Sequence, residues 1–246
     1  MKLVVAQIIY PILDSQWVSP VQVVPKKSGM TAMKNQHDEL VPARIQNSWR
    51  VYIDYQKLNQ ATSKDHFPLP FIDQVLERLA KKFHYCFLDG FFGFMQIHIA
   101  SVDQHKTNFT CPFSTFTYTK MLFGLCNAPS TFQICMINIF SDLWEDCMEV
   151  FMDDFTVYAE SYEACLENLS YVSTRCIETN LMLNFEKFHF IVIDGILLGH
   201  LVSNRGIEVD KAKVDIITSL SNPASMHFIK NFSKITLPLS MLPHLH

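Results

Sequence analysis

The sequence has little glycine and no long hydrophobic run. Only 7 of its 246 residues are glycine, whereas 20 are phenylalanine and 49% are hydrophobic. This composition excludes a disordered chain, because it offers ample apolar surface to bury in one large domain or two small ones. No apolar stretch reaches the roughly 20 residues that span a bilayer. Residues 1–11 are interrupted by Gln7 and Pro11 and are followed by no signal-peptide cleavage site, so we expect a folded start and no membrane segment.

The cysteines lack the spacing of a metal or redox motif. Seven are present and none belongs to a C-x-x-C pair, which excludes a zinc ribbon and a thioredoxin-like site. An odd, scattered set is typical of reduced thiols. We therefore expect an intracellular, cytoplasmic protein that is not secreted.

The charge is unevenly distributed along the chain. The net charge is −4, yet residues 26–64 hold seven Lys and Arg against three Asp and Glu, and residues 141–178 hold ten acidic residues and one basic residue. A basic segment followed by an acidic one suits a phosphate-binding surface beside a metal site. Two ordinary solvated faces explain the same charges equally well.

Two adjacent carboxylates, Asp153 and Asp154, have strand-like apolar residues on both sides. Two apolar runs with a two-residue polar link predict a tight β-hairpin that carries both carboxylates at its tip. Clustered oxygen ligands of this kind suit a hard cation such as Mg²⁺. Taken alone, the pair is more simply explained as turn residues, because Asp is common in turns.

The rest of the pattern predicts an α+β fold, with an antiparallel sheet backed by helices. Pro70 and Pro129 each open an expected helix, and Ser161 is the expected N-cap of a longer amphipathic one. Expected strands lie at 21–24, 50–55, 85–89, 94–100, 106–111, 115–120, 181–185, 188–192 and 196–202.

A third carboxylate, Asp89, ends the apolar run Cys86-Phe87-Leu88. Phosphoryl transfer with two metal ions about 3.5–4 Å apart needs such carboxylates on rigid elements. If the strands are neighbours, Asp89 would complete the set with Asp153 and Asp154. A turn role beside Gly90 is the alternative, and spacing alone favours neither reading.

Seven short blocks follow one another in a fixed order. The blocks lie at 8–21, 49–55, 67–70, 87–90 (Phe87-Leu88-Asp89-Gly90), 123–133 (Phe123-Gly124-Leu125-Cys126-Asn127-Ala128-Pro129-Ser130-Thr131-Phe132-Gln133), 151–154 (Phe151-Met152-Asp153-Asp154) and 198–200 (Leu198-Gly199-His200). Together they resemble the reverse transcriptase domain of gypsy-type long-terminal-repeat retrotransposons. The similarity runs from about residue 8 to 212 and returns at 227–242.

This resemblance implies a right-hand polymerase with fingers, a palm and a partial thumb. It implies that Asp89, Asp153 and Asp154 are the catalytic and metal-binding residues, holding two Mg²⁺ ions with Mn²⁺ as a substitute. The substrates and partners would be deoxynucleoside triphosphates and an RNA or DNA template with its primer. The implied substrate-binding residues are Arg50 with Lys26 or Lys27 on the triphosphate, Phe94 under the sugar, Phe123 and Gly124 in the nucleotide pocket, Met152 beside the primer end, and Leu198 and Gly199 on the primer strand. Without the resemblance, the sequence favours core packing as the role of Phe94. Lys187 matches a family lysine near the palm.

The C-terminal part departs from the family pattern. Met226 runs directly into His227, where family members carry about a dozen further thumb residues, and no RNase H, protease or integrase segment is present. We expect fingers and palm at 8–203 and a thumb or connection remnant with an internal deletion at 204–246. Such a truncated, degenerate copy would show little processive synthesis, because its grip on the duplex is reduced.

Three hypotheses follow. The chain is an RNA-directed DNA polymerase domain, located in the cytoplasm or in retrotransposon particles. Alternatively, it is an inactive remnant that binds nucleic acid without extending primers. An unrelated acidic metal-binding protein would require every matched block to be accidental. Primer extension separates the first two hypotheses.

Overall fold

The structure is a computed structural model that describes residues 2–13, 15–25, 30–34, 40–44, 49–210 and 214. The α-helices are α1 (Lys2–Val5), α2 (Gln56–Ala61), α3 (Ile72–Leu79), α4 (Ser101–Gln104), α5 (Ala128–Ile139) and α6 (Tyr162–Glu178). Short 3₁₀ turns are η1 (Gly93–Gln96), η2 (His105–Thr107) and η3 (Phe185–Lys187). The strands are β1 (Ile9–Pro11), β2 (Val21–Pro25), β3 (Met30–Lys34), β4 (Leu40–Arg44), β5 (Trp49–Ile53), β6 (His84–Asp89), β7 (Phe109–Cys111), β8 (Ser114–Tyr118), β9 (Met148–Phe151), β10 (Asp154–Ala159), β11 (His189–Val192), β12 (Asp194–Leu197), β13 (His200–Ser203) and β14 (Gly206–Val209).

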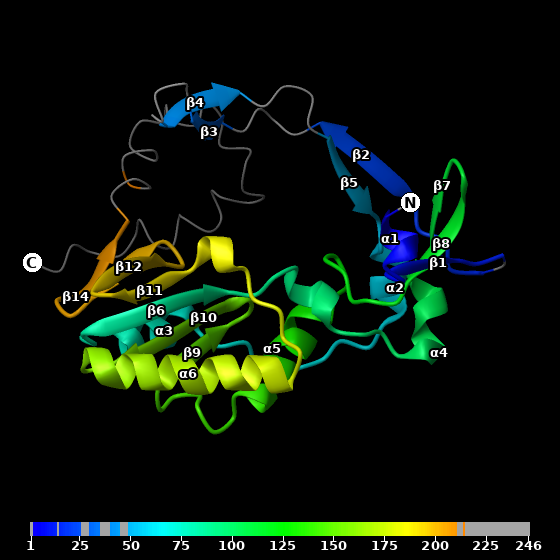
Figure 1. Cartoon of the computed structure of the whole chain (residues 1–246). Coiled ribbons are helices and arrows are strands. Elements are labelled where there is room, and N and C mark those ends of the chain that lie inside the picture. Colours follow the sequence, from blue (N-terminus) through cyan, green and yellow to red (C-terminus); the bar gives the residue numbers. More distant parts are fainter. Residues whose placement is uncertain are drawn as a thin grey trace, which may run out of the picture.

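The central sheet has four antiparallel strands in the order β11-β6-β10-β9. Helices α5 and α6 cover one face, and Figure 1 shows α6 lying along it. Alternate strand residues point to opposite faces, so β6 sends Cys86 and Leu88 into this core. Phe132 of α5 and Phe140, which follows the last residue of this helix, are fully buried in the same layer. The expected α+β class with an antiparallel sheet backed by helices is confirmed.

The opposite face of this sheet is covered by α3 and by the three-stranded sheet β12-β13-β14. Tyr85 and Phe87 of β6 point to this side, with their rings 5.7 Å apart. Because β6 is buried on both faces, it is an almost continuous apolar run that ends at Asp89. Beyond residue 203, β14 continues the same sheet by pairing with β13.

A second group of elements lies at one end of the central sheet, around β1, β7 and β8, which form one small sheet (Figure 1). Helix α2 lies nearby, and β2 pairs with β5. The expected strand at 50–55 ends at Ile53, because Tyr55 is the N-cap of α2. We did not predict this helix.

Several other expected elements differ in detail. Segment 94–100 is not one strand, because Phe92 is left-handed (φ 59°) and starts the 3₁₀ turn η1. Segment 196–202 is two strands, β12 and β13, separated by a tight turn. Segment 181–185 is not a named strand: its Leu183 makes one isolated bridge to Gly90, and η3 follows.

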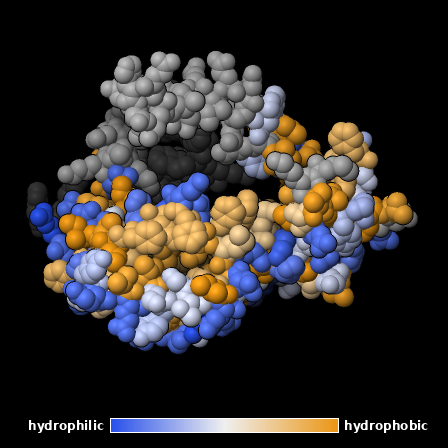
Figure 2. All heavy atoms as spheres, viewed as in Figure 1, coloured by the Kyte–Doolittle hydropathy of each residue, from blue (hydrophilic) through white to orange (hydrophobic). Residues whose placement is uncertain are grey.

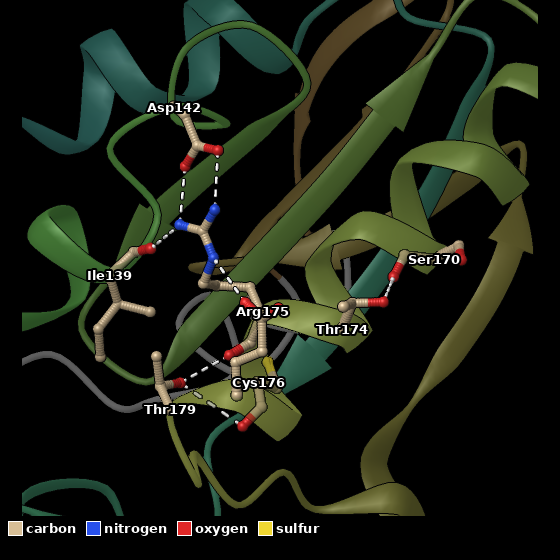
Figure 3. A network of polar contacts seen from close by, with 8 residues as sticks. Ile139, Asp142, Ser170, Thr174, Arg175, Cys176 and Thr179 are labelled. Carbon is tan, nitrogen blue, oxygen red and sulfur yellow. Dashed lines mark hydrogen bonds and ion pairs between the residues drawn. The ribbon is translucent and has the colours of Figure 1, made fainter.

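The helix expected after Ser161 is α6, and its cap is confirmed. The Ser161 hydroxyl accepts a hydrogen bond from the Ala164 amide at 3.2 Å. Helix α6 is joined to α5 by Arg175, which Figure 3 shows reaching across to Asp142. Its guanidinium donates to the Ile139 carbonyl at 2.6 Å and to both Asp142 carboxylate oxygens at 2.8 Å. Arg175 thus satisfies an end carbonyl of α5 and ties the two covering helices together.

Gly195 in β12 allows close contact between the two sheets. A Cβ atom at this position would lie 2.1 Å from Cε2 of Phe87, whose side chain is buried. Gly195→Ala should therefore lower the free energy of unfolding by about 1–3 kcal/mol, as overpacking of a core does. Denaturant unfolding measures this loss. Gly206→Ala is the control. Gly206 has a positive φ of 128° and no atom within 4 Å of an added Cβ, so alanine there introduces backbone strain without overpacking.

Apolar side chains gather on the surface between α6 and β11. Figure 2 shows apolar residues in the middle of the visible face. Ile177, Met182, Phe185 and Phe190 line one cavity between these two elements, and all four are more than half exposed.

Among the described residues, no helix has both the length and the apolar character that crossing a membrane requires.

Candidate active site

Asp89 and Asp154 lie directly opposite each other on neighbouring strands. Asp89 ends β6, Asp154 begins β10, and the two are register partners in the antiparallel pair. Opposed residues in such a pair have Cβ atoms about 4.5–5.5 Å apart. The strands therefore present two carboxylates at one edge of the sheet.

Asp153 lies beside them in the turn between β9 and β10. Its carbonyl accepts a hydrogen bond from the Gly90 amide at 2.7 Å. A Cβ atom on Gly93 would lie 3.3 Å from Oδ2 of Asp153, so the loop after Asp89 packs closely against this carboxylate. The structure thus brings Asp89, Asp153 and Asp154 to one place.

The position of the turn differs from the expected one. The two-residue link is Met152-Asp153 rather than Asp153-Asp154, because Asp154 is already paired with Phe151 as the first residue of β10. One carboxylate is therefore on the turn and the other is on a strand. Met152, the first turn residue, is left-handed with φ 54°.

The carboxylates act on one another electrostatically. Burial, followed by the negative charges of Asp153 and Asp89, raises the pKa of Asp154 to about 6. Lys187 opposes this effect. Its ammonium lies 2.8 Å from Oδ2 of Asp89, and this hydrogen bond raises the pKa of Lys187. The site therefore has an excess of negative charge that a cation would stabilise.

The donor set fits a hard divalent cation by its chemistry. Three carboxylates converge, and one of them already contacts the cationic group of Lys187. As the side chains stand, no group of three or more His, Cys, Asp and Glu residues in the described part of the chain is arranged to hold a metal ion. A metal at this position would require the carboxylates to turn towards it.

A cavity of about 440 Å³ opens beside Asp89 and Asp154. Lys187, His189 and Leu197 also line it. Leu198 and Gly199 follow Leu197 and form the turn between β12 and β13, both with positive φ (49° and 82°). Leu198 and Gly199, the residues expected to contact the primer, thus directly follow a residue of this cavity.

Phe94 lies in η1, directly after Gly93 and therefore close to Asp153. Its ring centroid is 4.7 Å from that of Phe123 and 5.3 Å from that of Phe132. Phe132 is fully buried, whereas Phe123 is 70% exposed. Phe94 is thus half-buried between the core and an open surface, which is compatible with both packing and substrate contact.

The loop that contains Phe123 and Gly124 is held by Asn59 of α2. Asn59 Nδ2 donates to the Gly124 carbonyl at 2.7 Å, and the Cys126 amide donates to Asn59 Oδ1 at 2.9 Å. No role for Asn59 was predicted from the sequence. Its partners lie more than 60 residues away, and no local pattern indicates such a contact.

The expected triphosphate-binding cations cannot be placed. Lys26 and Lys27 lie outside the described residues. The backbone of Arg50 is described as part of β5, but its side chain is not. Their roles stay predictions.

Glu149 of β9 contacts Arg78 of α3. Glu149 is 2% exposed, and its Oε1 lies 3.2 Å from Nη1 of Arg78, which also contacts Glu145 at 2.7 Å. Burial raises the pKa of Glu149 to about 7, although Arg78 acts in the opposite direction. The ordinary value of 4.5 applies to the unfolded chain.

This raised pKa predicts a pH-dependent stability. Between pH 4.5 and 7 the folded state holds a proton at Glu149 that the unfolded state releases, so the contribution of Glu149 to stability is largest below pH 4.5 and is lost as pH rises to about 7. The contribution is of the order of 3 kcal/mol. Glu149→Gln should flatten this part of the stability profile, measured by urea unfolding. Glu160→Gln, at a side chain that is 63% exposed, should leave the slope in place.

Comparison with known proteins agrees with this geometry. The model of the family "Reverse transcriptase (RNA-dependent DNA polymerase)" matches residues 24–228. The chain is 34% identical over 91% of its length to the retrovirus-related Pol polyprotein from transposon 297 of Drosophila melanogaster, and 29% identical over 89% of its length to that from transposon gypsy. It spans about 20% of each of these relatives.

The fold is also similar to that of solved structures. A foamy viral protease-reverse transcriptase in complex with double-stranded DNA superposes with a TM-score of 0.78 at 19% identity, covering 97% of this chain and 41% of that one. A foamy viral protein in complex with an RNA/DNA hybrid gives a TM-score of 0.75 over 97% of this chain and 31% of that one. The resemblance to long-terminal-repeat retrotransposons is confirmed, and the chain belongs to the reverse transcriptase (RNA-dependent DNA polymerase) family.

Proposed function

We propose that this chain adds deoxynucleotides to a primer 3′-hydroxyl, copying an RNA or DNA template. The observation that carries the proposal is the convergence of Asp89, Asp153 and Asp154 at one sheet edge in a chain of this family. Strands hold the backbone of Asp89 and Asp154, so only the side chains would need to turn when a cation binds. The fingers and palm would comprise residues 8–203, and residues 204–246 would belong to a thumb or connection.

The three carboxylates would hold divalent cations, Mg²⁺ or Mn²⁺, and we propose two ions. When bound, such ions neutralise triphosphate charge and activate the primer hydroxyl. Asp154, whose pKa is raised to about 6 by burial and by its two neighbours, would be held in the charged form by the cation. Lys187, which contacts Asp89, would supply a further positive charge beside the site.

Other residues of the chain would bind and orient the substrates. Phe94 would lie under the sugar, and Phe123 and Gly124, held by Asn59, would line the nucleotide pocket. Met152, Leu198 and Gly199 would contact the primer. Lys26, Lys27 and Arg50 would bind the triphosphate.

Primer extension tests this function. Purified protein is incubated with oligo(dT) annealed to poly(rA), dTTP and Mg²⁺, and products are resolved to single-nucleotide length. We expect primers lengthened by added dT residues, with none when the divalent cation is chelated. Binding of primer–template without any extension would instead indicate an inactive nucleic-acid-binding protein, and absence of both would contradict the proposal.

A further inference from the structure

Gln133 is a fully buried amide in the mostly apolar inner face of α5. Its side chain is 0% exposed, and its neighbour Phe132 is equally buried. Both ends of the amide are hydrogen-bonded. Nε2 donates to the Val150 carbonyl at 2.9 Å, and Oε1 accepts from the Met152 amide at 2.8 Å. These backbone groups lie on either side of Phe151, at the end of β9.

The partners of Gln133 are on the open edge of the sheet. Strand β9 is the last strand in the order β11-β6-β10-β9, and Phe151 pairs with Asp154 across the hairpin. Because backbone groups alternate in direction along a strand, Val150 and Met152 direct theirs away from β10. The amide of Gln133 takes the place of the missing neighbouring strand and satisfies this edge.

The same bond holds a backbone conformation that is unfavourable for its residue. Met152 has φ 54°, a region that non-glycine residues seldom occupy. Such conformations persist where the surroundings hold them in place. The Met152 amide is bonded to Gln133, and the next residue is Asp153. A change in the Met152 backbone therefore changes where the Asp153 carboxylate points.

We propose that Gln133 is a positioning residue that holds the Met152-Asp153 turn, and with it the Asp153 carboxylate, in the geometry required for nucleotide addition. The effect of Gln133 on catalysis rests on the proposed function. The stabilisation of the turn by Gln133 is independent of that function, because it can be measured in the protein without substrate.

Gln133→Met is the informative substitution, because it keeps the length of the side chain and removes both hydrogen bonds. We expect the kcat of single-nucleotide addition to fall about 10- to 100-fold, the range in which misplacement of a reacting group by about 1 Å lies. The Kd for primer–template should stay within about threefold, since Gln133 itself is buried and Met152 is only one of the proposed primer contacts. Gln104→Met is the matched control. Gln104 also bonds a backbone carbonyl, that of Ile99 at 3.0 Å, but far along the chain from the turn.

A second substitution separates positioning from general loss of structure. Glycine adopts positive φ without strain, so Met152→Gly should be less dependent on the Gln133 bond. In a double-mutant cycle, Gln133→Met should cost at least about threefold less in kcat when residue 152 is glycine than when it is methionine. Equal costs in both backgrounds would show that Gln133 acts only through the stability of the core.

Hydrogen exchange provides the readout without activity. The Met152 amide should be protected in the wild-type protein and in Gln104→Met, and should lose protection selectively in Gln133→Met. Lost protection with unchanged kcat would overturn the positioning role, and unchanged protection would overturn the hold itself. If the wild-type protein shows protection but never extends a primer, the proposed function fails while the hold on the turn stands.

Discussion

Asp153→Asn is expected to abolish primer extension while leaving the fold intact. The carboxylate of Asp153 lies on a turn and contacts the loop after Asp89, so the isosteric amide can occupy the same space. It cannot supply the negative charge that a divalent cation requires. The rate of single-nucleotide addition should fall by about 100-fold or more, because a bound metal ion lowers the activation barrier by several kcal/mol.

The effect should be specific to the three converging carboxylates. Asp89→Asn should cause a loss of similar size, since Asp89 lies opposite Asp154 on the neighbouring strand. Asp194→Asn removes the same charge from an exposed position at the start of β12 and should have little effect. Thermal unfolding and primer–template binding of each variant serve as controls. Extension at near wild-type rate by Asp153→Asn would exclude the proposed chemistry.

Phe94→Val is expected to admit ribonucleotides. In the proposed pose the ring fills the space that a 2′-hydroxyl would need, so discrimination comes from a clash and a smaller side chain relaxes it. The ratio of kcat/KM for dTTP to that for UTP should fall at least about tenfold, which corresponds to about 1.4 kcal/mol. Valine keeps apolar contact with the buried Phe132, which limits the cost in stability.

The alternative for Phe94 is core packing alone. The ring does contact Phe132, so Phe94→Val should lower the unfolding temperature to some extent in either case. Phe113→Val provides the matched control, since that side chain is 92% exposed in the turn between β7 and β8. An unchanged dTTP to UTP ratio in a folded, active Phe94→Val protein would support packing as its only role.

Local sequence signals predicted the elements that carry the carboxylates. The apolar run before Asp89 is β6, and the apolar residues around Asp153 and Asp154 are β9 and β10. Ser161 caps α6 through its own side chain, a contact over three residues that a local pattern can indicate. That Asp89 and Asp154 lie side by side could be predicted only on the condition that β6 and β10 are neighbouring strands. The sequence does not reveal this pairing, because the two strands are far apart along the chain.

What the sequence did not predict depends on contacts between distant segments. Gln133 stands between apolar neighbours in a helix, and its partners lie 17 and 19 residues further along the chain. The left-handed conformations of Phe92, Met152 and Leu198 fall on residues that rarely adopt them. The apolar pattern of 94–100 and 196–202 matched extended strands, but the 3₁₀ turn η1 (Gly93–Gln96) overlaps the first segment and a turn at Leu198-Gly199 divides the second.

A crystal structure with bound substrates and manganese tests the metal site most directly. The wild-type protein would be crystallised with a primer–template whose primer lacks a 3′-hydroxyl, with the matching deoxynucleoside triphosphate and with Mn²⁺. Anomalous scattering then locates the ions. The prediction is manganese bound by carboxylate oxygens of Asp89, Asp153 and Asp154, between the primer end and the triphosphate. Manganese held elsewhere, with these three carboxylates free of metal, would contradict it.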